Sequence, residues 1–512
     1  MNYIYSEIYS MTQTLRVTTH PDYPDAADDI KTIRDGIEGS QCVKRAGYRY
    51  LPHPSQIDKD SKEQQIRYLE FLGGAEYDGF PDDTRRELLG KMRISNTNFE
   101  FNDRLEYIIQ NADGDGMPLN ASIEYAVNNV LQTKWHVLVV DTKNAPVGDA
   151  KLSKAERAQL KTRTNIKQYT RENVVNWNFS TVNDVMQLSY IELLQVSSDF
   201  DASSGTHDRV ETYLIMALDE NGDYYQQVKT FGGKTGEATT TEPDYPKIKG
   251  KPLKWLPVVI LADEELPPYK MPNQLGYLSQ IVTAALHRYR VSANYKEVQR
   301  NIAPTIMNSG WKDGDMDIFK EANNQRSYIA TGAGAVNNMP EGVTSEVLSC
   351  AAEMSDFQWY FEYNEKKIRS MGGDANTQGV TMTATEADIT ASKQNALLNT
   401  IADNADQGFQ RAVAYCGMFE GLYSPDDIES SLDDIVIELP RDFATPKLTD
   451  AEVQEYRQDY INGLITQEQY IKIMIKGGRR DGDIDEILAE LEEAPPTGQP
   501  VDNNGQLNDN QN

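Results

Sequence analysis

Cysteine is scarce in this chain, with three among 512 residues. Cys42, Cys350 and Cys416 lie far apart without CxxC spacing, so the sequence supports neither a disulfide framework nor a structural zinc site. Apolar stretches are short, such as Leu256–Ala262, whereas a membrane-spanning helix needs about 20 apolar residues. The N-terminus lacks the basic start and apolar run of a signal peptide. We expect a protein of a reducing compartment with no signal peptide and no membrane span.

Positive charge is also in short supply. The chain has 50 Lys and Arg against 79 Asp and Glu, a formal net charge of −29. A protein that reads DNA sequence through one broad basic face has the opposite balance, so that class is excluded. Hydrophobic residues at 39% and charged residues at 25% are ordinary for globular chains, and the length suggests about three folding units.

Phosphate and calcium motifs are missing as well. The segment GGKTGE at 232–237 has Val228 where a phosphate loop requires glycine, so we interpret it as a turn. NADGDG has Met117 at the fifth ligand position of a calcium loop, and DENGD has Thr230 in place of the bidentate Glu. Both are better explained as turns, although the first leaves a weak cation site open.

Catalytic signatures are absent from the sequence. The five histidines are dispersed, and no HExxH or GxSxG motif accompanies them. Carboxylates are so numerous that any pair can be nominated as acid and base, which makes the nomination uninformative without geometry. A triad assembled only in space stays open, but we expect no enzyme activity, no cofactor and no metal.

The first half of the chain combines short helices with a β-rich middle. Strand-like runs fill about 170–266, where DENG separates two of them and predicts a hairpin. A helix at 122–131 leads into a buried strand at 137–140. Further helices are predicted near 25–37, 63–72 and 81–92.

The second half is mainly helical. A long helix is predicted over Pro272–Asn301, then a compact insert, then a second helix over Ser345–Met371 whose acids precede its bases, as the helix dipole favours. A polar loop flanked by glycines leads to a very long helix from Thr385 to about Leu422. A strand, a small helical unit with TD and TQ helix starts, and a tail too polar to bury a core follow.

The order of these parts resembles the portal protein of tailed bacteriophages. Four segments strengthen the resemblance, which spans roughly residues 20–480: HPDYPDAADDIKTIRDGIEGSQCVKRAGYRYLP, NVVNWNF, APTIMNSG and TATEADITASKQNALL. It implies an α+β subunit of a ring of about twelve copies at one capsid vertex, through which a terminase packages DNA and DNA is later ejected. Capsid, scaffolding and adaptor or tail proteins are the other implied partners, and the virion is the implied location.

The resemblance divides the chain into the parts of a portal subunit. These would be an N-terminal arm and wing at 1–271, stem helices at 272–301 and 345–371, a clip at 302–344, a tunnel loop at 372–382, a long helix and wing strand at 383–448, a crown at 449–494 and a disordered acidic tail at 495–512.

The same resemblance suggests which residues meet DNA and partners. In an acidic channel a few basic rings would keep the duplex centred. The candidate channel residues are Lys366, Lys367, Arg369, Arg288 and Arg290, with Lys296 and Arg300 nearby and the short polar Asn376, Thr377 and Gln378 at the loop tip. The basic residues have an alternative role as partners of acids in neighbouring subunits. Trp311, Phe319 and Arg326 of the insert are the candidate docking residues for the terminase and the adaptor, with ordinary core packing as the alternative for Trp311.

Two other functions stay open at this point. One is a different ring-forming head-to-tail connector or collar protein, against which the long stem helix and the tunnel-like loop argue. The other is an acidic hydrolase with an unrecognised site, supported only by the abundance of carboxylates and tyrosines. The long helices with apolar stripes require neighbours, so we expect a homo-oligomer.

Overall fold

A computed structural model gives the fold, and Arg441 begins a second compact unit after the first, Met1–Pro440. The structure describes residues 18–53, 61–143, 163–182, 184–232, 238–267, 270–302, 305–327, 337–348, 354–372, 384–441, 443 and 450–476.

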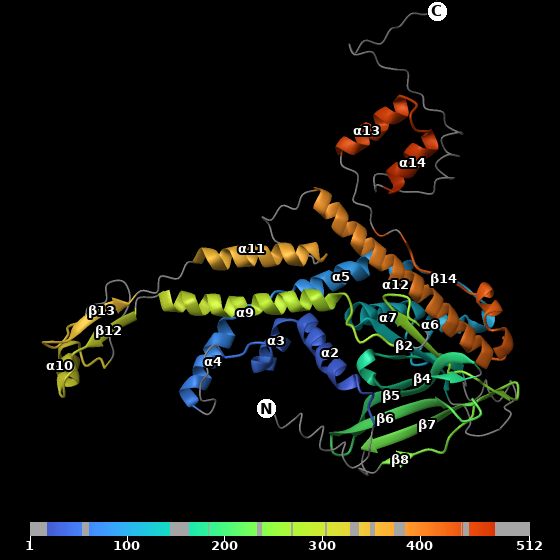
Figure 1. Ribbon diagram of the computed structural model, residues 1–512, viewed down its shortest axis with the longest axis horizontal. Coiled ribbons are helices and arrows are strands. Elements are labelled where there is room, and N and C mark those ends of the chain that lie inside the picture. The colour runs from blue at the N-terminus through green and yellow to red at the C-terminus, as the bar shows by residue number, and fades with distance from the viewer. Residues whose placement is uncertain are drawn as a thin grey trace, which may run out of the picture. The chain divides into compact units, whose positions relative to one another are not determined.

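Helices from the N-terminal part pack around one long central helix, α9 (Leu278–Ile302) (Figure 1). Buried Tyr68 and Phe71 meet Tyr289 of α9 in one apolar cluster. A Cβ at Gly36 would overlap Val282, so this glycine allows α2 to approach α9 closely. The helices that surround α9 are α2 (Tyr23–Glu38), α4 (Lys62–Gly74) and α5 (Phe80–Met92); α3 (Ser40–Ala46) packs on α2 and η1 (Gly47–Arg49) follows it.

A three-stranded antiparallel sheet forms the centre of the first unit, in the order β11 (Val258–Ala262), β2 (Trp135–Lys143), β3 (Arg163–Tyr169). The helix α7 (Leu119–Thr133) leads directly into β2, as the sequence predicts. Most of the residues of β2 are buried, which explains its nearly continuous apolar run. Shorter elements precede α7: η2 (Ile94–Asn96), β1 (Asn98–Glu100), η3 (Asp103–Leu105) and α6 (Tyr107–Gln110).

The β-rich middle of the chain forms a second, five-stranded antiparallel sheet after η4 (Arg171–Asn173). The predicted hairpin is confirmed, because Asp219 Oδ1 accepts hydrogen bonds from the backbone N–H groups of Asn221 (2.8 Å) and Asp223 (2.9 Å) at the tip between its strands. The strands in order are β4 (Val174–Val182), β5 (Val185–Asp201), β6 (Thr206–Leu218), β7 (Tyr224–Gly232) and β8 (Thr239–Thr240), and a separate pair is β9 (Lys247–Ile248) with β10 (Lys251–Pro252).

The long helix α12 (Ala384–Phe419) closely matches its predicted span and packs against β11, β2 and β3 (Figure 1). A Cβ at Gly408 would overlap Leu261 of β11, so the helix lies directly on the sheet at this point. After η5 (Pro425–Asp427) and η6 (Ser430–Asp434), β14 (Val436–Glu438) pairs antiparallel with β1. The predicted strand after the long helix is therefore confirmed.

Two of the predicted helix starts are wrong. The first long helix begins at Leu278 rather than Pro272, because the carbonyls of Pro272, Asn273 and Gln274 accept side-chain hydrogen bonds instead of starting a helix. The second begins at Met354 (α11, Met354–Ser370), since Thr344–Leu348 forms strand β13 paired with β12 (Thr305–Ser309). Between these two strands lies the short helix α10 (Asp315–Ala322).

The second unit contains two helices, α13 (Asp450–Ile461) and α14 (Gln467–Lys476). The predicted TQ start of α14 is confirmed as a capping box: Gln469 N–H donates to Thr466 Oγ1 (3.2 Å), and Thr466 N–H donates to Gln469 Oε1 (2.9 Å). Tyr460 and Tyr470 stack with ring centroids 5.2 Å apart and join the two helices. The predicted disordered tail at 495–512 lies outside the described residues.

Candidate assembly surface

The helices α9 and α11 form the pair in which the candidate channel residues lie. Tyr295 of α9 meets Phe357 and Phe361 of α11 edge to face, with ring centroids 5.6 Å and 5.9 Å apart. Arg288 Nη1 donates to the Phe361 carbonyl (3.0 Å), and its guanidinium lies over the Phe361 ring (4.9 Å). Aromatic and cation–π contacts of this kind hold the two helices side by side.

A polar network fixes the segment that leads into α9. Buried Arg171 donates to the carbonyls of Thr133 (2.9 Å), Asn273 (2.9 Å) and Gln274 (2.5 Å), and its guanidinium lies 5.2 Å from the Trp135 ring centroid. Burial lowers the pKa of Arg171 to about 10, so the side chain keeps its charge at neutral pH. The start of α9 is therefore tied to the central sheet.

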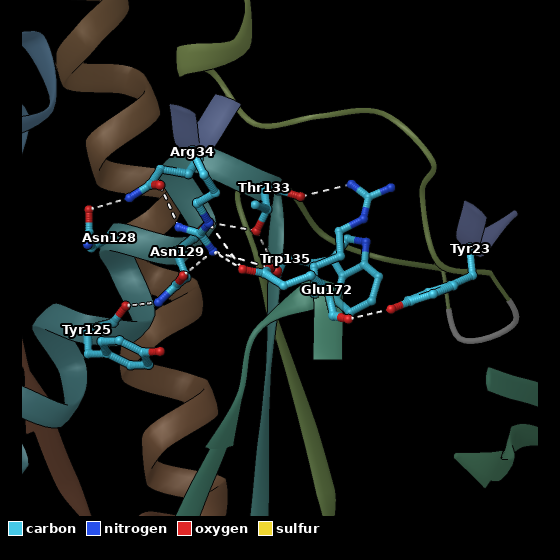
Figure 2. Close-up of polar contacts among 10 residues, drawn as sticks. Tyr23, Arg34, Tyr125, Asn128, Asn129, Thr133, Trp135 and Glu172 are labelled. Carbon is cyan, nitrogen blue, oxygen red and sulfur yellow. Dashed lines mark hydrogen bonds and ion pairs between the residues drawn. The ribbon is translucent and has the colours of Figure 1, made fainter. Parts of the chain in front are cut away.

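Arg34 extends this network to the N-terminal helices, as Figure 2 shows. It forms an ion pair with Glu172 (3.0 Å) and donates to Gln132 Oε1 (2.5 Å) and Asn129 Oδ1 (2.6 Å) of α7. Tyr23 donates its hydroxyl proton to the Glu172 carbonyl (2.9 Å). Helix α2 is thereby joined to the sheet edge that positions α9.

The arginines proposed for a channel are engaged within the chain. Arg288 forms an ion pair with Asp78, and Arg290 Nε donates to the Tyr50 carbonyl (2.8 Å). Arg369 pairs with Glu365 of its own helix at 3.1 Å. All three side chains are half-buried, so their placement gives them a structural role in the subunit. Lys296 likewise pairs with Glu76 (3.3 Å), and the side chain of Arg300 lies outside the described part.

Lys366 and Lys367 differ from these arginines because both are exposed on α11. Within the described residues neither lysine forms an ion pair. Among the described residues they are basic groups of this helix pair that remain available to a partner. Asn376, Thr377 and Gln378 lie outside the described residues, so the predicted loop tip is untested.

The outer face of α11 also carries two large aromatic residues that the sequence interpretation did not single out. Trp359 is 64% exposed and Tyr363 is 51% exposed, and their rings stack with centroids 5.4 Å apart. Their i, i+4 spacing, followed by Lys366 three residues after Tyr363 and by Ser370 four residues later, is the signal that places them on one face of a helix. Exposed aromatics beside charged residues are typical of interfaces.

Polar contacts hold the C-terminal end of α11 in place. Tyr277 donates a hydrogen bond to the Met371 carbonyl, and Gln394 Nε2 of α12 donates to the Gly372 carbonyl (2.6 Å). Gln394 Oε1 in turn accepts from Lys91 Nζ of α5 (2.7 Å). These contacts satisfy carbonyls that a helix end leaves without intrahelical partners. The segment after Gly372 therefore starts from a fixed point.

The α/β unit formed by β12, α10 and β13 contains the three candidate docking residues. Phe319 is 1% exposed and meets Trp311 edge to face (5.8 Å), so the structure places Phe319 in the core of this unit and not on its surface. Trp311 is half-buried, which agrees with the alternative of core packing. Half-buried Arg326 donates to the Asn323 carbonyl (3.1 Å). Exposed Met316 and Ile318 of α10 are further apolar groups that the sequence interpretation missed.

The described part of the chain holds no group of three or more His, Cys, Asp or Glu side chains placed to bind a metal. The turn at Asp113 uses Oδ1 to accept from the backbone of Asp115 (2.8 Å) and Met117 (3.0 Å). A cavity of about 300 Å³ before α9 is lined largely by loop residues: Glu264, Leu266, Pro267, Lys270, Pro272, Asn273 and Gln274. No described helix is long and apolar enough to cross a bilayer.

Comparison with known proteins gives similarities to one family model and to solved structures. Residues 277–420, less than half of the chain, match a family described as a domain of unknown function (DUF4055). This region runs from the start of α9 to the end of α12. No curated protein matches the chain.

Among solved structures, the chain is similar to one described as "Neck of native GTA particle computed with C12 symmetry". The identity is 10% and the TM-score 0.36, with 85% of this chain and 98% of that chain covered. These values are too low to transfer the role of that protein to this chain.

Proposed function

We propose that this chain is a ring-forming head-to-tail connector of a tailed bacteriophage, and specifically the portal subunit. The observation that carries the proposal is the order of parts in the first unit. A β-rich body is followed by α9, a small α/β unit, the adjacent helix α11 and the very long helix α12. This is the order of wing, stem, clip, stem and wing helix that the resemblance implies.

The role of the ring is to pass double-stranded DNA during packaging and ejection, without reading its sequence. The net charge of −29 supports this role, since an acidic wall repels phosphates and lowers friction on a moving duplex. Lys366 and Lys367 are the exposed basic candidates on α11. Exposure alone fits either of the two roles considered for them, at the channel or at a neighbouring subunit.

The α/β unit between α9 and α11 is the proposed docking site for the terminase and later for an adaptor ring. Its apolar surface groups Met316 and Ile318 lie on one short helix, and Met307 on the paired strand is also exposed. Exposed apolar side chains at the end of a helix pair are suited to a protein partner. The assigned function is thus structural, and the assigned location is the virion.

The mass and rotational symmetry of the purified full-length chain test the proposal. Mass photometry and class averages of negatively stained particles are expected to give a closed ring of about twelve copies with a central channel. A compact monomer or dimer across the micromolar range would contradict the connector and return attention to the hydrolase. A metal-dependent hydrolysis screen on the same preparation separates that alternative.

A further inference from the structure

Helix α4 exposes an apolar patch of its own, defined here as the α4 patch: Ile66, which is 56% exposed, and Leu69, which is 62% exposed. The opposite side of the same helix is buried, where Tyr68 and Phe71 join the cluster around Tyr289 of α9. Apolar residues at 66 and 69 therefore contribute nothing to that core. An exposed pair of large aliphatic residues on a helix indicates a surface that another protein covers.

The outer face of α11, with Trp359 and Tyr363, is the second exposed patch, called here the α11 patch. The two helices that carry the patches, α4 and α11, lie on opposite sides of α9 (Figure 1). Some residues of α9 belong to the apolar cluster with Tyr68 and Phe71 of α4, and others contact α11. On a helix of 3.6 residues per turn, these two sets of side chains point about 140° apart. One chain cannot bring its own two patches together while both helices pack on α9.

Charged residues run in opposite orders along the two patches. Along α4, exposed Lys62 comes first and exposed Glu70 follows the apolar pair. Along α11, exposed Asp356 precedes Trp359, exposed Glu362 lies between the two aromatic residues and exposed Lys366 follows Tyr363. When the two helices lie side by side and parallel, Lys62 lies at the same end as Asp356 and Glu70 at the same end as Lys366, while the apolar residues meet between them.

We propose that the α4 patch of one subunit binds the α11 patch of the next, so that Ile66 and Leu69 cover Trp359 and Tyr363. The partner is a second copy of this chain. The contact joins two different surfaces, which makes it a heterologous contact. Repeating such a contact generates a closed ring when the successive rotations between subunits add up to a full turn. The inference rests on the proposed ring and deepens it by naming the surfaces that meet.

This contact also assigns Lys366 to the neighbouring subunit rather than to the channel wall. Its place on the same helix face as Trp359 and Tyr363 puts its amine beside Glu70 of the next copy. Lys367 projects to one side of that face and remains a candidate for the channel. The two lysines, adjacent in sequence, therefore have different roles.

Disulfide trapping of the full-length protein tests the contact directly. The variant carrying Ile66→Cys and Trp359→Cys is oxidised with copper phenanthroline under air, and dioxygen takes up the two electrons and two protons that the thiols release. A ladder of covalent multimers on non-reducing gels is expected. Each single variant and the unmodified chain, which carry the native cysteines, serve as controls, as does Val196→Cys with Trp359→Cys, which pairs α11 with an exposed position on the five-stranded sheet.

Charge reversal gives a second, independent readout. Lys366→Glu alone and Glu70→Lys alone each place like charges across the contact, and each is expected to lower the fraction of chain in rings at fixed concentration by roughly twofold or more. An equal mixture of the two variants restores opposite charges at every contact when the subunits alternate. Assembly in the mixture is therefore expected to exceed that of either variant alone, which an effect within one chain does not produce.

The outcomes separate this inference from the proposed function. In one result, the unmodified chain forms rings while the double-cysteine variant gives no ladder beyond the controls; in another, it forms rings while mixing the charge variants does not increase assembly. Either result overturns the proposed contact between α4 and α11 and leaves the proposed connector function in place. A monomeric unmodified chain overturns both. Rings that persist in Trp359→Ala while binding to a DNA duplex is lost also overturn the contact, because the aromatic patch then faces nucleic acid.

Discussion

Trp135 and Trp359 show how differently the central sheet and the α11 helix use the same side chain. Trp135 is 1% exposed; its indole N–H donates to the Pro272 carbonyl (3.1 Å), and its ring lies beside Arg171 and Trp177. Trp359 is in contact with Tyr363 but mostly faces solvent. One region uses its large aromatics to hold the subunit together, whereas the other presents them outward.

The contrast extends to polar groups. Around the sheet, Arg171 and His136 are buried and hydrogen-bonded to groups of the same chain. On the outer face of α11, Lys366 and Lys367 are exposed, and they form no ion pair within the described residues. A face with exposed aromatic and charged groups that form no ion pair with other described residues fits an assembling subunit. Substitutions in the two regions should therefore affect different measurements.

The largest expected loss of unfolding free energy comes from a substitution at the central sheet. Trp135→Ala removes a buried indole and leaves a cavity, and it should lower the free energy of unfolding by about 3–5 kcal/mol. Urea titration followed by far-UV circular dichroism measures the change, at a concentration where the chain is monomeric. A loss below about 1 kcal/mol would contradict the assignment of Trp135 to the core.

Acidification gives the next largest effect on the sheet side. Burial, with a smaller contribution from Arg34, lowers the pKa of His136 from 6.5 to about 4, although its hydrogen bond to Gln168 (2.7 Å) acts in the opposite direction. The unfolded chain takes up the proton first, so the stability that His136 contributes is present above pH 6.5 and is lost as the pH falls toward 4.

Between pH 7 and pH 5 this loss should amount to about 2 kcal/mol. The measurement compares the unfolding free energies of the unmodified chain and His136→Gln at both pH values, because other titrating groups act equally in both proteins. The variant should lose about 2 kcal/mol less on acidification. Equal losses of unfolding free energy in the two proteins would mean that His136 has the same pKa in the folded and unfolded states.

Gln394, which connects the end of α11 to α5, should give an intermediate loss of stability when it is replaced. Gln394→Leu leaves the Gly372 carbonyl without its donor and Lys91 without its amide acceptor, which should cost about 1–3 kcal/mol. Hydrogen exchange of the last turn of α11 reports the loss locally. Gln280→Leu, at an exposed position of α9, is the matched control, and an equal effect there would rule out a specific contact at Gln394.

The smallest expected effect is on the outer face of α11. Trp359→Ala and Tyr363→Ala remove exposed rings, and each should change the unfolding free energy of the monomer by less than about 0.5 kcal/mol. The same variants should nevertheless reduce ring formation, as observed by mass photometry. A stability loss comparable to that of Trp135→Ala would remove the contrast between the two regions.

Long periodic or strongly alternating segments were the predictable part of the fold. The span of α12, the hairpin at Asp219 and the capping box at Thr466 follow from local signals, because apolar spacing, turn residues and cap residues act within a few positions. The helix predicted from Ser345 failed because β13 depends on pairing with β12, which begins 40 residues earlier. The helix start at Pro272 failed because distant Arg171 holds the carbonyls of that segment.

The candidate surface was only partly predictable for the same reason. Lys366 and Lys367 are exposed, but the spacing of charges along α9 and α11 did not reveal that Arg288 pairs with Asp78 and that Arg290 donates to the Tyr50 carbonyl. Phe319 belongs to a residue type common at interfaces, yet the small unit needs a core and uses this ring for it. Residue type indicates what a side chain can do, whereas tertiary packing decides whether it is exposed.

The pairing of β12 with β13 has an implication for how this chain can vary. Thr305 is paired with Leu348. The two ends of the segment 305–348, which follows α9 and precedes α11, therefore lie next to each other. A segment whose ends meet in this way can be lengthened, shortened or replaced at little entropic cost to the rest of the fold. The α/β unit is thus a natural site for exchange between related chains, where its proposed docking role can change while α9 and α11 keep their sequence.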